Sequence, residues 1–107
     1  AEQLSREGLD VEVIDPRTLR PLDLDTIVTS VTKTGRLVIV EEGWRFCGLG
    51  AQIAESIYSA AFDYLDGPIV RVTGEDVPIP YSRPLEDAAI PDVPRVVAAV
   101  KSLCGVA

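Results

Sequence analysis

The sequence contains no histidine and no methionine, and its 107 residues include only two cysteines, Cys47 and Cys104. The lack of histidine removes the commonest general base, the Ser-His-Asp arrangement and most zinc sites. Two distant cysteines without a CxxC motif form neither a structural metal site nor a disulfide scaffold, so we expect a reducing compartment. These absences predict a chain with no catalytic, cofactor-binding or metal-binding residues of its own.

Long apolar runs and basic clusters are also missing. No run is long enough to cross a bilayer, and the first residues do not resemble a secretory signal. Ten basic residues against seventeen acidic ones give a net charge of -7. This balance argues against partners such as nucleic acid or an anionic membrane, which need gathered lysine and arginine. An acidic surface suits a basic protein partner, or it serves solubility alone.

The remaining composition predicts one α/β domain over residues 1–107, because 47% of the residues are hydrophobic and the length suits one core. Apolar, β-branched runs predict strands at 11–14, 37–40 and 69–72. Helical spacing and capping residues predict helices between Asp23 and Gly35, from about 49 to 62, and between Asp92 and Gly105. Alternating strands and helices indicate a three-layer α/β/α architecture with a mostly parallel sheet.

The beginning of the chain and the segment 74–90 are less regular. Leu4 and the helix-ending Gly8 indicate a short helix at the start. Since no initiator methionine is present, we expect the chain to begin inside a larger structure, with a first strand left in the parent protein. The proline-rich segment 74–90 exceeds the usual length of a connection. It is either a functional loop or a tether that returns the last helix to the sheet.

The loop after the second predicted strand carries two acids and two glycines. Glu41 and Glu42 are neighbours whose side chains point to opposite faces of a strand, so we expect solvated acids rather than a paired site. Gly48 and Gly50 form part of a dinucleotide-binding fingerprint, but Ile53 occupies its third glycine position. The glycines therefore favour close packing of the next helix, with an anion-binding module as the alternative.

Aromatic residues in the same loop predict a contact surface. Trp44 and Phe46 flank Arg45, and these residue types are enriched at the hot spots of protein interfaces. The alternative for Trp44 is a lid that folds back onto the core.

Five segments, taken in order, resemble the C-terminal transketolase-like domain of 2-oxo-acid dehydrogenase E1 β-subunits. They are residues 11–23, 33–44, 48–53, 62–68 and 71–81. The block from Arg71 to Tyr81 is similar to the pyruvate dehydrogenase branch, with a branched-chain or acetoin dehydrogenase as the alternative. The chain departs from the family pattern at Pro16 and within 45–47.

The resemblance implies a mostly parallel sheet flanked by helices, whose first strand this chain lacks. It implies a parent α2β2 enzyme that decarboxylates pyruvate on thiamine diphosphate with Mg and transfers the acetyl group to lipoate on an E2 core. In the family the cofactor lies between the α-subunit and the N-terminal domain of the β-subunit. This chain alone would then bind no cofactor and be inactive. The implied location is the mitochondrial matrix or the bacterial cytoplasm.

The resemblance also implies partners: the E1 α-subunit, a second E1 β-subunit and the basic peripheral subunit-binding domain of E2. For that last domain it implies contacts from Asp66 and from the terminal carboxylate on Ala107. Without the resemblance, an ordinary turn residue before Gly-Pro would be the favoured interpretation of Asp66. The residues expected at subunit interfaces are Trp44, Phe46, Gly48, Gly50 and Tyr81.

Overall fold

The computed structural model describes residues 1–106. Its helices are α1 (Glu2–Arg6), α2 (Leu24–Thr34), α3 (Leu49–Ala61), the 3-10 helix η1 (Phe62–Tyr64), α4 (Arg83–Ala89) and α5 (Val93–Leu103), and its strands are β1 (Val38–Trp44) and β2 (Val70–Gly74). None of the described helices has the length and apolar character needed to span a membrane.

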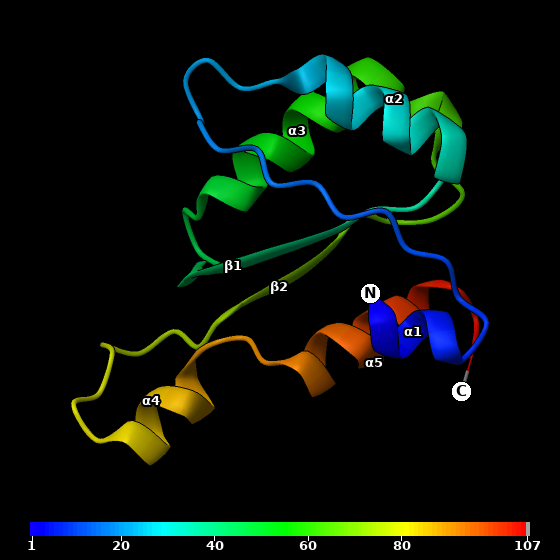
Figure 1. Cartoon of the computed structure of the whole chain (residues 1–107). Coiled ribbons are helices and arrows are strands. Elements are labelled where there is room, and N and C mark those ends of the chain that lie inside the picture. Colours follow the sequence, from blue (N-terminus) through cyan, green and yellow to red (C-terminus); the bar gives the residue numbers. More distant parts are fainter. Residues whose placement is uncertain (107) are drawn as a thin grey trace.

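The two strands pair in parallel at the centre of the molecule, with Val38 opposite Val70 and Val40 opposite Val72. Helices α2 and α3 lie on one face of this sheet, and α1 and α5 lie on the other (Figure 1). Parallel strands need a crossover connection, and α3 supplies the one between β1 and β2. The three-layer α/β/α architecture predicted from the sequence is therefore confirmed.

The main core lies between α2 and α3. Its buried residues are Ile27 and Val31 from α2 and Ile57 and Ala61 from α3. Each pair is spaced four residues apart, which places both members on one helix face. Leu37 and other partly buried residues from the neighbouring segments pack around this cluster.

Local signals fix the ends of the two helices that the sequence predicts best. The backbone N–H of Thr26 donates to the Asp23 carboxylate at 3.2 Å, and that of Arg95 donates to Asp92 at 2.9 Å. Gly35 ends α2 in the left-handed conformation with φ 74°, which glycine adopts without a steric cost.

Two expectations about the secondary structure are wrong. Residues 11–14 form no strand, and Val13 is 74% exposed. No described backbone hydrogen bond joins this segment to β1, and a strand requires a neighbouring edge as well as a suitable composition. The segment 74–90 is no plain loop, since it contains α4, which follows Ser82 and has Pro84 in its first turn. Proline is favoured there, because the first turn does not need its missing N–H.

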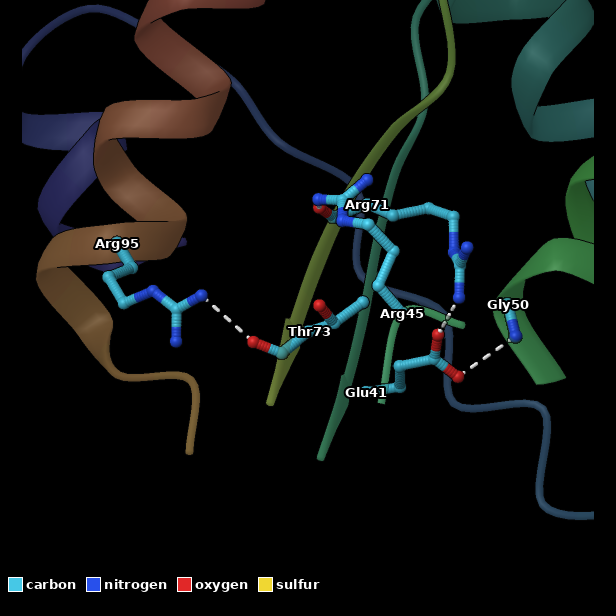
Figure 2. Close-up of polar contacts among 6 residues, drawn as sticks. All are labelled: Glu41, Arg45, Gly50, Arg71, Thr73 and Arg95. Carbon is cyan, nitrogen blue, oxygen red and sulfur yellow. Dashed lines mark hydrogen bonds and ion pairs between the residues drawn. The ribbon is translucent and has the colours of Figure 1, made fainter. Parts of the chain in front are cut away.

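An ion pair between Glu41 of β1 and Arg71 of β2 joins the sheet to α3 (Figure 2). The side chains are only 15% and 13% exposed. The second carboxylate oxygen of Glu41 accepts the backbone N–H of Gly50, in the first turn of α3, at 2.9 Å. The expectation of solvated acids therefore holds for Glu42, which is exposed, and is wrong for Glu41.

Two further arginines bond to backbone oxygens of β2 (Figure 2). Arg45 donates to the carbonyl of Arg71 at 2.7 Å, and Arg95 of α5 donates to the carbonyl of Thr73 at 2.8 Å. Arg95 also lies 3.6 Å from the Glu75 carboxylate. Side chains from β1's end and from α5 thus hold β2 from two directions.

We predict that Glu41→Gln destabilises the chain by about 3 kcal/mol, because it leaves the largely buried Arg71 without its counter-charge. Urea unfolding at neutral pH measures the effect. The matched control is Glu42→Gln at the exposed neighbour, expected within about 0.5 kcal/mol of the wild type. Equal unfolding midpoints for the two variants would contradict this role of the ion pair.

A second prediction concerns the stability of the fold at acidic pH. The hydroxyl and the backbone N–H of Thr26 donate to Asp23 and hold the pKa of its carboxyl below the ordinary value of 3.8. A lowered pKa means that this cap stabilises the fold fully above the ordinary value and ceases to do so as the pH falls through the lowered one.

Asp23→Asn should therefore reduce the melting temperature near neutral pH, and the gap to the wild type should close as the pH falls from the ordinary carboxyl pKa of 3.8 through the lowered one. Thermal unfolding followed by circular dichroism tests this. Asp10→Asn, at an exposed acid, is the control. A gap for Asp23→Asn that does not change with pH would count against the cap.

Candidate functional site

Asp66 lies in the turn before β2 and is exposed. Its backbone N–H donates to the carbonyl of Gly35 at 2.7 Å, and its carboxylate covers Gly35 so closely that a Cβ there would collide with Oδ2. No ion pair of the described residues includes Asp66. The turn thus presents a carboxylate whose charge is not neutralised within the described chain.

The position of this carboxylate strengthens its attraction for a cation. Gly35 is the C-cap of α2, and the C-terminal end of a helix carries roughly half a negative charge. Asp63 in η1 is a second exposed acid nearby in sequence. A lysine or arginine from outside would be favoured here by the acid and by the helix dipole together.

The end of α5 lies beside the same turn. A Cβ on Gly67 would lie 3.4 Å from Cδ1 of Leu103, the last residue of α5. The segment that follows α5 therefore starts close to Asp66. The second residue predicted for partner binding, Ala107, lies outside the described residues.

The predicted aromatic residues lie at the other end of the sheet. Trp44 ends β1, and its indole N–H donates to the carbonyl of Val77 at 2.9 Å. This bond ties the loop after β1 to the loop after β2. Trp44 remains 46% exposed. It therefore does not form the lid over the core that was the alternative prediction for this residue.

Phe46 and Tyr81 in these two loops project into solvent. Phe46 is 78% exposed, and the side chain of Tyr81 has no cover within the chain. The neighbouring apolar residues Val77, Ile79 and Leu85 are also exposed. Exposed apolar side chains such as these, in the two loops and in α4, are the kind that an interface with another protein covers.

Gly48 and Gly50 have an intramolecular role. A Cβ on Gly48 would lie 2.7 Å from Nη2 of Arg71, and one on Gly50 would lie 2.7 Å from Oε1 of Glu41. Both glycines therefore let α3 begin directly against the ion pair. Gly50 is buried and Gly48 partly buried, and their place at a subunit interface stays a prediction.

The same packing bears on the anion-binding alternative. The start of α3 already holds the carboxylate of Glu41, whose Oε2 accepts the N–H of Gly50. A phosphate or pyrophosphate would have to displace this acid. The residues present therefore do not fit the diphosphate of a bound cofactor at this helix start.

Sequence reasoning missed the roles of Arg71 and Arg95. Arg71 stands in an apolar strand, and a charged residue in such a run indicates a buried partner. That signal was available for Arg71, whereas the contact of Arg95 with Thr73 depends on how α5 docks.

Comparisons with known proteins agree with this architecture. Residues 1–96 match the family model described as "Transketolase, C-terminal domain". The chain is 55% identical over 97% of its length to the pyruvate dehydrogenase E1 component subunit beta of Rickettsia felis, of which it covers 32%. It is 53% identical over 97% of its length to that of Rhizobium meliloti, covering 23% of the relative. It is 52% identical over 94% of its length to the human mitochondrial subunit, covering 28%.

The chain thus spans no more than about a third of the length of these relatives. The resemblance stated from the sequence is confirmed, together with the fold that it implied. The family match covers most of the chain, and the chain therefore belongs to the transketolase C-terminal domain family.

Proposed function

We propose that this chain is the assembly and docking domain of the β-subunit of a pyruvate dehydrogenase E1 component. The observation that carries the proposal is the exposed Asp66 carboxylate, which lies at the negative end of α2 without a described counter-charge. The partner it fits is a basic one: the peripheral subunit-binding domain of E2.

Charge and position support this assignment. The chain carries a net charge of -7, which speeds the approach of a basic partner. The end of α5 lies beside the turn that holds Asp66, so the segment leading to Ala107 starts close enough to add a second contact.

The aromatic loops at the opposite end of β1 are the proposed contact with another subunit, either the α-subunit or a second β-subunit. Trp44 fixes the two loops together through Val77, so Phe46 and Tyr81 are presented on a braced surface. Rigid aromatic side chains lose little conformational entropy on binding.

The parent enzyme would act on pyruvate with thiamine diphosphate and Mg. Thiamine diphosphate supplies the electron sink for decarboxylation when it is bound. In this proposal the cofactor is held outside this chain, which contributes assembly and docking instead of catalytic groups. Bacterial and mitochondrial relatives agree with a location in the bacterial cytoplasm or the mitochondrial matrix.

We predict that Asp66→Asn weakens binding to a subunit-binding domain by about tenfold, because a charge-assisted hydrogen bond contributes about 1.5–3 kcal/mol. Titration calorimetry at low salt measures the affinity. Asp63→Asn is the matched control at an exposed acid of η1 and should reduce affinity much less. Unchanged affinity for Asp66→Asn would remove Asp66 from the docking site.

We also predict that the double substitution of Phe46 and Tyr81 by serine weakens subunit association by about tenfold or more, because two exposed aromatic anchors are lost. Sedimentation velocity of the chain, alone and with an E1 α-subunit, measures it. Tyr64→Ser, at another exposed aromatic residue, controls for a general loss of apolar surface. Association that persists undiminished in the double variant would show that these loops are not the contact.

A further inference from the structure

The outer edge of β2 is the side of that strand that faces away from β1. Within the described residues β2 pairs with β1 only, and the backbone N–H of Val70 donates to the carbonyl of Leu37 at 3.1 Å. In a parallel ladder, alternate residues of a strand direct their backbone N–H and C=O groups to opposite sides. Since Val70 faces β1, the backbone groups of Arg71 and Thr73 belong to the outer edge.

Two arginine side chains occupy the carbonyl groups of this edge. Arg45 donates to the carbonyl of Arg71 at 2.7 Å, and Arg95 donates to the carbonyl of Thr73 at 2.8 Å. Figure 2 shows Arg95 approaching β2 from the side opposite β1. Both guanidinium groups therefore lie where a pairing strand would place its own N–H donors.

The chain closes the edge directly after β2. The backbone N–H of Glu75 donates to the carbonyl of Ala89, the last residue of α4, at 2.7 Å. The carboxylate of Glu75 also lies 3.6 Å from Arg95, which helps to hold that arginine over the strand. The acceptors of the outer edge and the donor that follows them are thus all engaged within the chain.

The composition of β2 explains why this edge needs cover. Val70, Val72 and Thr73 are β-branched, as is typical of residues that pair readily in sheets. The outward N–H groups of Arg71 and Thr73 have no backbone acceptor within the described residues. An edge with free donors and a β-branched composition is a template for pairing with another chain.

We propose that Arg45 and Arg95 block the outer edge of β2 against pairing with the same edge of a second copy of the chain. Two copies of one edge are self-complementary about a two-fold axis, so a second copy is the partner that this edge fits. A paired strand would lie about 4.8 Å from β2. The arginine nitrogens already lie 2.7 and 2.8 Å from its carbonyl oxygens, so both side chains would have to leave first. The proposal is independent of the docking and assembly roles given above.

The test is hydrogen exchange of the Arg71 and Thr73 amides, followed by NMR over a range of protein concentrations in the Arg45→Ala/Arg95→Ala variant. In the wild type we expect the rates to be independent of concentration. In the variant they should fall as the concentration rises, by about tenfold once roughly nine-tenths of the molecules are paired. Loss of stability alone would speed exchange, so a slower rate identifies pairing.

Two matched variants separate this role from net charge. Arg17→Ala/Arg83→Ala also removes two positive charges, from arginines whose side chains are 85% and 89% exposed. Its exchange rates at β2 should not depend on concentration. Arg45→Lys/Arg95→Lys keeps a charged donor at each position and should keep the edge closed, because lysine at an edge also opposes pairing.

Three outcomes would overturn the proposal. Exchange in the alanine variant that is faster at every concentration, with no slowing as the concentration rises, would show that the arginines only brace β2. Equal slowing in the Arg17→Ala/Arg83→Ala control would assign the effect to net charge. Slowing confined to amides outside β2 would assign the association to another surface.

Discussion

The ion pair between Glu41 and Arg71 is the contact on which the arrangement of the layers depends. It links the two strands across the sheet, and the same carboxylate accepts the first-turn N–H of Gly50. Since the pair is largely buried, its attraction is screened little by water, and either charge alone would be costly there. Gly50 follows from this constraint, because a side chain there would overlap with the pair, whereas a side chain at Gly48 would meet the backbone carbonyl of Trp44 as well as the pair.

The parts of the fold that could be predicted from the sequence are those set by neighbouring residues. Asp23 and Gly35 define α2 because a cap acts within three or four residues of the helix end. The segment 11–14 has the composition of a strand, but a strand also needs an edge, and composition carries no information about whether that edge is present. The sequence did not predict α4, because proline, here Pro84, is common both in loops and in the first turn of a helix.

The residues of the candidate site also fall into those that the sequence could predict and those that it could not. The exposed aromatic residues in the loops could be foreseen from residue type and loop position. The role of Glu41 could not, because Arg71 lies thirty residues further along the chain and only the parallel register of the strands brings the two together. Asp66 lies against the C-terminal end of α2, which is distant in the sequence. Its neighbours in the sequence indicate only an ordinary turn, so this position could not be predicted.

The two proposed contact surfaces lie at opposite ends of β1, since Asp66 bonds to Gly35 just before the strand and Trp44 is its last residue. Two partners could therefore be bound at once without competing for space. The crowding at Gly35 adds a further consequence. Any residue with a side chain at that position would push the Asp66 carboxylate aside as well as strain the helix end. A substitution at Gly35 would thus alter the proposed contact surface without replacing the acidic residue that it presents.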